Sequence, residues 1–225
     1  MTNEIKATSV SEAIGTVIAK LCYRASDDLG EGFSEKTGEW RRGNALTILN
    51  NADKKYNDIS ITGKEQAHPR LVHHIIEEGS WTDSTHVQNM WSGLLASSCT
   101  ESGDDESNLI FINLLKQISS VQALILNYAC ENCATVLTEG GWIGAEPISI
   151  QLDKLIEITE TDDIHRLDRE LDHLRSIEII YGGFEPDSTT AEITPTALAL
   201  QLYVRCHGYI GSPIDYFDLS ENNQP

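Results

Sequence analysis

Two adjacent histidines with two acidic neighbours are the side chains best suited to acid–base or metal chemistry in this sequence. His73 and His74 are followed by Glu77 and Glu78, and His74 and Glu78 would share a helix face because they lie four residues apart. A hydrolytic metal site needs at least three convergent protein ligands, and no HExxH or similar pattern supplies the others. We therefore expect a surface hydrogen bond or ion pair here. A metal-dependent hydrolase or nuclease with an unrecognised site is the alternative.

The sequence contains five cysteines, and Cys130 and Cys133 have CxxC spacing. Such a pair can form half of a zinc site or a redox couple. No second CxxC and no His pair lies at ligand spacing, and the two cysteines fall in a stretch of small and apolar residues with helical spacing. Buried free thiols are therefore the favoured interpretation. The odd number of cysteines indicates a reducing compartment, and we expect no metal and no other cofactor.

Motifs for nucleophilic catalysis and phosphate binding are absent from the sequence. It has no GxSxG, no P-loop and no GxGxxG pattern, and the acidic run Asp104-Asp105-Glu106 lacks the ligand spacing of an EF-hand. We therefore predict no catalytic residues. Trp81 and Trp91 are expected to pack in the core, and exposure of either ring would instead mark a contact surface.

The charge balance limits the classes of partner. The chain of 225 residues has 16 Lys and Arg against 35 Asp and Glu, for a formal charge of −19. Clustered cations, which bind a phosphate backbone, are missing, so no direct contact with nucleic acid is expected. A protein partner, for which a basic surface would fit, or self-association is expected instead.

No run of about 20 apolar residues is present, so we expect no membrane segment. The N-terminus lacks a signal-peptide pattern, which predicts a cytoplasmic protein.

Apolar residues recur at intervals of three and four along most of the chain, which predicts helices. The expected helices cover residues 8–28, 34–56, 109–118, 121–129 and 162–176. Another is expected to begin at Pro69, where the missing N–H costs nothing, and another after a side-chain cap at Asp83 or Ser84. Trp40 is predicted to face inward and Arg41 outward.

The C-terminal third combines helices with short β-prone segments. Residues 140–147 are predicted as a loop, and a short strand that runs into a helix is expected from Ile148 to Leu155. Further strands are expected within 177–184 and at 191–193, and the last helix is expected to start with Thr194 as N-cap. This order is typical of a winged-helix module, which usually reads DNA. Its helix at 162–176 holds five acidic residues and fewer cations, with Arg166 and Arg169 among them. Such a surface would repel phosphate, so a structural or protein-binding role is expected.

The predicted fold class is mainly α: a helical bundle with a small C-terminal winged-helix-like α+β part. The expected parts are N-terminal helices at 1–66, a central helical domain at 67–146, the winged-helix-like module at 147–212 and a tail at 213–225.

Several motifs resemble one known family. They are His68-Pro69-Arg70, Trp81-Thr82-Asp83, the run from Val87 to Ser98 around Trp91, and the segment 111–118. With these motifs the chain resembles the Abi-alpha (abortive infection alpha) family, formerly a domain of unknown function, over residues 25–210. The resemblance implies a bacterial origin, a mainly helical fold and a role in defence against phage. It implies no catalytic residues.

The motif residues His68, Arg70, Trp81, Asp83 and Trp91 are the candidate interaction residues. The first functional hypothesis is a non-enzymatic sensor or adaptor of an abortive infection system that works through protein–protein contacts. The second is the metal-dependent hydrolase or nuclease. The third is an acidic decoy that occupies the groove of a DNA-binding protein, which predicts salt-sensitive binding to a basic partner.

Overall fold

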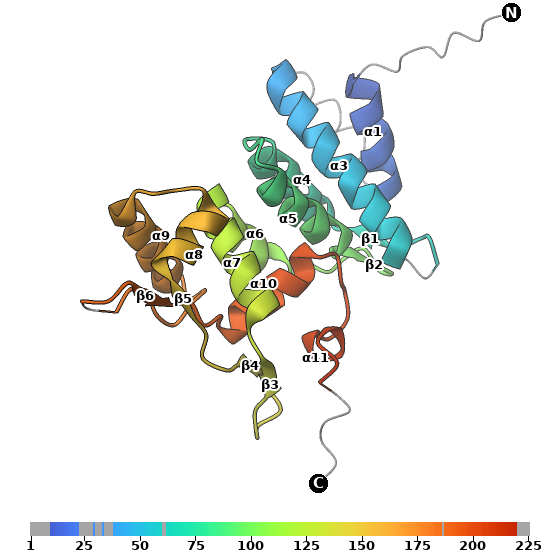
Figure 1. The fold of residues 1–225 in the computed structure, drawn as a ribbon. Coiled ribbons are helices and arrows are strands. Elements are labelled where there is room, and N and C mark those ends of the chain that lie inside the picture. The colour runs from blue at the N-terminus through green and yellow to red at the C-terminus, as the bar shows by residue number, and fades with distance from the viewer. Residues whose placement is uncertain are drawn as a thin grey trace, which may run out of the picture. The chain divides into compact units, whose positions relative to one another are not determined.

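The computed structural model describes residues 10–22, 29, 33, 38–59, 62–185 and 187–219. The described chain is mainly helical, with small antiparallel sheets, as the sequence predicts (Figure 1). Its residues divide into two compact units. The first unit comprises Met1–Lys116 with Cys206–Gly208, and the second comprises Gln117–Arg205 with Tyr209–Pro225. The division into four parts that the sequence suggests stays a prediction.

The first unit is built from helices and one two-stranded sheet. Its elements are α1 (Val10–Leu21), α3 (Glu39–Ile59), β1 (Gln66–Ala67), α4 (Pro69–Gly79), α5 (Thr85–Ala96), β2 (Cys99–Thr100) and α6 (Leu109–Leu115). Helix α3 packs against α1 and α5 (Figure 1). Of the helix predicted over 8–28, Val10–Leu21 form α1 and Cys22 follows its end, whereas residues 8–9 and 23–28 lie outside those that the structure describes.

The core of the first unit lies where α3 meets its neighbours. Ile48 and Leu49 of α3, Ile18 of α1 and Leu94 of α5 are fully buried. Trp40 was expected to join them but is half exposed. It lies in the first turn of α3, above the part of the helix that carries the buried residues. The buried face of α3 therefore begins after Trp40, later in the helix than the sequence pattern predicted.

Helix α4 begins as predicted, with Pro69 in its first turn. The Nδ1 atom of His68 accepts a hydrogen bond from the backbone N–H of Arg70 at 3.2 Å, so a histidine caps the helix. Helix α5 has Ser84 as its N-cap residue, but no side-chain capping bond is formed there, contrary to the prediction. The Ser84 backbone N–H instead donates to the Thr82 side chain. The side-chain hydrogen bond therefore forms within the turn before α5 and does not cap the helix.

Helix α5 lies unusually close to another segment of the first unit. A Cβ atom on Gly93 would lie 1.7 Å from the backbone oxygen of Cys206 and 3.0 Å from the backbone nitrogen of Gly208. No side chain fits in that space, because carbon and oxygen atoms in contact need about twice that separation. Gly93 therefore allows α5 and the segment Cys206–Gly208 to pack backbone to backbone.

The second unit combines helices with two strand pairs. Its elements are α7 (Ser120–Asn132), β3 (Thr135–Leu137), β4 (Ile143–Ala145), β5 (Ser149–Gln151), α8 (Leu152–Thr159), α9 (Ile164–Ser176), β6 (Thr190–Glu192), α10 (Ala197–Cys206) and α11 (Pro213–Tyr216). Helix α7 packs against α8 and α9. The buried face of α9 consists of Leu167, Leu171 and Leu174, the helical spacing that the sequence predicts.

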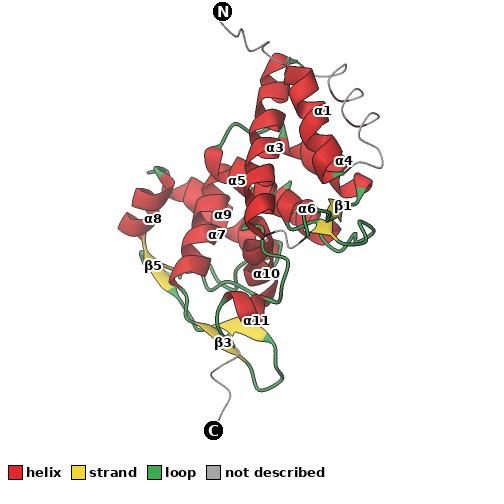
Figure 2. Cartoon of the chain, turned by 90° about the vertical axis from the view of Figure 1, so that its right-hand side faces the viewer, coloured by secondary structure: helices red, strands yellow, loops and turns green. Residues whose placement is uncertain are grey.

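The strands of the second unit are short and antiparallel (Figure 2). Strand β3 pairs with β4 and strand β5 pairs with β6. Residues 140–147 were expected to be a loop, but they contain β4, because the turn at Gly141, with its φ of 80°, folds the chain back onto β3. The β-prone stretch 177–184 forms isolated bridges at Ile180 and Phe184 rather than a named strand.

A threonine caps α10, but not the one that was predicted. The Oγ1 atom of Thr196 accepts a hydrogen bond from the Ala199 N–H at 3.1 Å. Thr194, the predicted cap, instead accepts from the Ile148 N–H and donates to Glu192. The Thr194 side chain is thus bonded to the segments around the β5–β6 pair and does not cap the helix. Helix α10 therefore starts two residues later than predicted.

The segment predicted as a tail begins with structure. Helix α11 is capped by Ser212, and Tyr216 and Phe217 contact the ring of Tyr203. Among the described residues, no helix combines the length and the apolar content needed to cross a bilayer.

Candidate functional site

The five candidate interaction residues all lie in the first unit, but the structure does not bring them together. His68 and Arg70 lie at the start of α4, whereas Trp81 and Asp83 follow its end. A helix of this length spans about 16 Å at 1.5 Å per residue. Trp91 lies in α5 and is buried as predicted, against Gly79. The set therefore divides into two surface groups and one core residue.

The group at the start of α4 is a surface ion pair. Arg70 Nη1 lies 3.0 Å from Glu106 Oε1, and both side chains are about half exposed. His68 Nδ1 lies 3.9 Å from the same carboxylate oxygen, but it already accepts the Arg70 backbone N–H, so it does not donate to Glu106. An exposed pair of this kind contributes about 0–1 kcal/mol. Its geometry indicates a structural role.

Trp81 is exposed, against the prediction that it packs in the core. Its exposed fraction is 61%. The reason is that α4 ends at Gly79 and the Trp81 N–H bonds the Glu78 backbone oxygen in a turn, so Trp81 lies outside any helical apolar face. Its exposure makes the ring a candidate for the contact surface that an exposed tryptophan was expected to mark.

The guanidinium of Arg41 stacks on this ring. It lies 4.1 Å from the Trp81 ring centre and 5.4 Å from the ring centre of Phe33. Arg41 was expected to point into solvent, yet only 13% of its side chain is exposed. It donates to Ser80 Oγ and to the Glu77 backbone oxygen, and it pairs with the Glu77 carboxylate at 3.0 Å. We call Trp81, Arg41, Ser80 and Glu77 the Trp81 patch.

Buried amides hold the turn beneath the Trp81 patch. Asn44 Nδ2 donates to the backbone oxygen of Ser80 at 3.1 Å, and Gln88 Nε2 donates to that of Thr82 at 2.9 Å. Gln88 also donates to Asn44 Oδ1 at 3.3 Å, and both amide side chains are buried. The backbone on each side of Trp81 is thus fixed by α3 and α5. A partner would meet an aromatic ring that is already held in place, which reduces the entropy cost of binding.

The histidines of α4 show no metal-binding arrangement. The described residues contain no group of three or more His, Cys, Asp or Glu side chains that could hold a metal ion. Burial and the charges of His73 and Arg70 lower the pKa of His74, and Glu78 opposes this effect. The surface hydrogen bond or ion pair that the sequence suggests for His74 and Glu78 stays a prediction.

The five cysteines form no disulfide, and burial disfavours reactivity at Cys99 and Cys133. Cys130 is buried and Cys133 is half-buried at the end of α7. Burial raises the pKa of Cys133, and burial raises the pKa of Cys99 to about 12. Reactive thiols have lowered pKa values instead. Cys130 thus has the burial expected of a structural thiol, whereas Cys133 is only half-buried.

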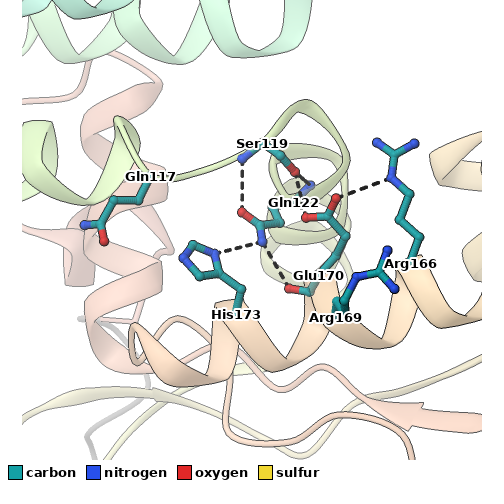
Figure 3. A pocket seen from close by; sticks show the side chains of 7 residues that line it. All are labelled: Gln117, Ser119, Gln122, Arg166, Arg169, Glu170 and His173. Carbon is teal, nitrogen blue, oxygen red and sulfur yellow. Dashed lines mark hydrogen bonds and ion pairs between the residues drawn. The ribbon is translucent and has the colours of Figure 1, made fainter.

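The second unit contains a polar pocket that the sequence did not reveal (Figure 3). It has a volume of about 390 Å³ and lies between the start of α7 and one face of α9. Its lining residues are Gln117, Ser119, Gln122, Arg166, Arg169, Glu170 and His173. The available signal was the spacing of Arg166, Arg169, Glu170 and His173, which places four polar side chains on one helix face.

Comparison with known proteins finds one family. The sequence model of a family described as abortive infection alpha matches residues 44–200. That range includes α4, α5, the Trp81 turn and the pocket of the second unit. No curated protein and no solved structure matches the chain.

Proposed function

The chain belongs to the abortive infection alpha family, and from this premise we propose that it acts as a non-enzymatic sensor or adaptor in bacterial defence against phage. It works in the cytoplasm by binding another protein. The family supplies the defence context, and the Trp81 patch supplies the surface.

The observation that carries this proposal is the exposed Trp81 ring stacked on a nearly buried arginine. Trp and Arg dominate the residues that contribute most to protein interfaces. Trp81 combines a large exposed apolar area with a backbone held by Asn44 and Gln88. An interface that included this ring would bury apolar area without first having to order the turn.

Charge suggests the kind of partner. Asp83 lies two residues after Trp81 and is exposed, and the Glu77 carboxylate, which pairs with Arg41, is about half exposed. A cationic side chain of the partner would gain both an aromatic face and a neighbouring carboxylate. We therefore propose a partner protein with a basic surface. Self-association through the Trp81 patch is the alternative.

We propose in addition that the C-terminal part is a winged-helix-like module used for protein contact. Its support is the order β5, α8, α9 and β6, with β5 and β6 paired, and the Phe184–Ala191 bridge beside them. The Glu185 N–H bonds the Thr190 oxygen, as in the hairpin of a wing. The second unit is strongly acidic: residues 117–225 hold five of the 16 Lys and Arg but 18 of the 35 Asp and Glu. That charge favours a protein over a DNA duplex.

The experiment compares two exposed tryptophans. Cells that express the chain alone, or with its neighbouring genes, are challenged with a varied phage panel, and plating efficiency and host growth are measured. Trp81→Ala is expected to abolish protection wherever the unchanged chain protects. Trp142→Ala is the matched control, since Trp142 is 76% exposed in the second unit and lies outside the patch.

The outcomes separate the hypotheses. Protection that needs the neighbouring genes and is lost with Trp81→Ala, while the variant still folds, supports the adaptor. Protection by the chain alone, with full activity in Trp81→Ala, would remove the patch from the mechanism and favour an effector with its own chemistry. Protection in neither setting would contradict the defence role.

A further inference from the structure

The charge of α9 is not spread evenly around the helix. Asp168, Asp172 and Arg175 lie outside the pocket, and Arg175 pairs with Asp172 at 2.5 Å. Arg166 and Arg169 line the pocket instead, one helical turn apart. The acidic total of the helix therefore conceals a pocket face with two arginines and one carboxylate. Bulk charge, which argued against any phosphate contact, misses this separation.

The one carboxylate of the pocket is already compensated. Glu170 Oε2 accepts the Ser119 hydroxyl at 2.9 Å, and Arg166 Nε lies 3.5 Å from Oε1. Only 16% of the Glu170 side chain is exposed. Its charge is thus screened from an incoming anion, and the start of α7 adds the positive end of a helix dipole beside it.

Hydrogen bonds around Gln122 define the protonation of His173. The Ser119 N–H donates to Gln122 Oε1 at 3.0 Å, so the amide oxygen is identified and Nε2 must face the other way. Gln122 Nε2 then donates both to the Glu170 backbone oxygen at 3.2 Å and to His173 Nδ1 at 2.9 Å. His173 Nδ1 is an acceptor, which leaves its proton on Nε2. The histidine therefore offers the pocket a donor.

The arginines offer more donors. Among the described residues, Arg169 forms no ion pair and no side-chain hydrogen bond, and Arg166 uses only Nε. Both terminal nitrogens of Arg166 and the whole guanidinium of Arg169 remain open. Figure 3 shows the two arginines at one end of the pocket and His173 with Gln117 at the other, with Ser119, Gln122 and Glu170 between them. The free hydrogen-bonding capacity is thus mostly that of donors.

We propose that this pocket binds a small phosphate-bearing ligand of about nucleotide size, with its phosphate at Arg166 and Arg169. A phosphate offers only acceptors, and the arginine fork matches it in bidentate geometry. The volume of about 390 Å³ lies in the range of small-molecule sites. The part of the ligand beyond the phosphate would extend toward His173 and Gln117.

The same phosphate chemistry exists in free nucleotides and in nucleic-acid strands. The free ligand fits better, because the acidic surroundings of the pocket repel a long polyanion, while one phosphate meets the two arginines and the already compensated Glu170. Asp162, Asp163, Asp168 and Asp172 are the carboxylates of α9 and its start that a strand would have to pass.

The test is isothermal titration calorimetry of the full chain in phosphate-free buffer of low ionic strength. The probes are inorganic phosphate, adenosine 5′-monophosphate and a short single-stranded DNA oligonucleotide. Saturable binding of the two small probes is expected, with the monophosphate nucleotide the tighter. Arg169→Ala should weaken it by about tenfold or more, and Arg169→Lys by less, because a lysine keeps the charge without the fork.

Arg175→Ala is the matched control, since it removes the same charge from α9 outside the pocket. It should leave the affinity unchanged, and Arg169→Ala should keep the unfolding temperature because Arg169 is exposed. No saturable binding of either small probe would overturn the proposal. Equal losses of affinity in Arg169→Ala and Arg175→Ala would also overturn it, because they would indicate unspecific charge attraction. Binding of the oligonucleotide without binding of the small probes would overturn it as well.

Discussion

Arg41 shows how strongly one side chain can tie a surface residue to the core. Its guanidinium bonds Ser80 and Glu77 and stacks under Trp81, so it joins α3 to the turn after α4. The aliphatic part of an arginine packs well while its head remains polar. At this scale, the Trp81 patch depends on Arg41 as much as on the tryptophan.

Replacing Arg41 should destabilise the protein. Arg41→Ala leaves the Glu77 backbone oxygen and Ser80 Oγ without this donor, and we expect the free energy of unfolding to fall by about 1–3 kcal/mol. The free energy of unfolding of Arg41→Lys should lie between those of the unchanged protein and Arg41→Ala, because one ammonium group cannot replace the several N–H donors of a guanidinium. Urea unfolding measures the change. Lys54→Ala, an exposed position on the same helix, is the control and should stay within about 0.5 kcal/mol; equal losses would contradict the role of Arg41.

His74 should make stability depend on pH. Burial first, and then the charges of His73 and Arg70, lower its pKa in the folded protein from the ordinary value of 6.5. The unfolded chain therefore binds a proton more readily, and the free energy of unfolding should decrease as the pH falls through 6.5 toward the lower folded pKa. The effect is small, because the side chain is partly exposed.

Urea unfolding of the unchanged protein and of His74→Gln between about pH 7.5 and pH 5 measures this effect. The free energy of unfolding of His74→Gln, relative to that of the unchanged protein, should increase as the pH is lowered. His86→Gln, at an exposed position of α5, is the control and should keep the pH dependence of the unchanged protein. A difference that stays constant over this range would show that His74 titrates alike in both states.

The packing of elements depends on close backbone approach at Gly93. Helix α5 lies against Cys206–Gly208 at a distance that excludes any Cβ atom. Large apolar side chains elsewhere on α5, such as Leu94 and Leu95, are fully buried. The helix therefore uses a glycine for one neighbour and leucines for the others.

Gly93→Ala should destabilise the protein by about 3 kcal/mol or more, since its methyl group would overlap the Cys206 carbonyl and force the two segments apart. Gly43→Ala is the matched control within α3, where a Cβ atom would meet no atom within 4 Å. It should stabilise the protein by up to about 1 kcal/mol through helix propensity. Thermal and urea unfolding of both variants test the opposite signs. A mild effect of Gly93→Ala would contradict the close packing.

The whole molecule carries a charge of −19, and more than half of its acidic residues belong to residues 117–225. Charges of one sign repel within a compact chain and reduce its stability. Salt screens this repulsion, with a Debye length of about 10 Å at 0.1 M. The acidity of the protein is thus a property of the molecule rather than of any one site.

Raising sodium chloride from about 20 mM to about 200 mM should therefore raise the thermal unfolding midpoint, because screening relieves the repulsion. Potassium chloride at the same ionic strength should have the same effect. A midpoint that falls with salt would mean that attractive ion pairs, such as Arg41 with Glu77, outweigh the repulsion.

The helices were largely predictable because their signals are local. The spacing of Leu167, Leu171 and Leu174, and the proline at the start of α4, depend only on residues within one or two turns. The family resemblance is local in the same sense, because it rests on short motifs around Trp81 and Trp91. Local patterns therefore determined the mainly helical fold and the abortive infection family.

The tertiary structure decided which of these residues are exposed and which meet. Trp81 and Trp91 belong to one motif, yet one ring is exposed and the other is buried. The difference arises because α4 ends before Trp81, whereas Trp91 packs against Gly79. The one stacking partner of the Trp81 ring described above, Arg41, lies 40 residues away in the chain. The pocket likewise needs α7 beside α9. Such neighbours are distant in the chain, and no spacing within one helix encodes them.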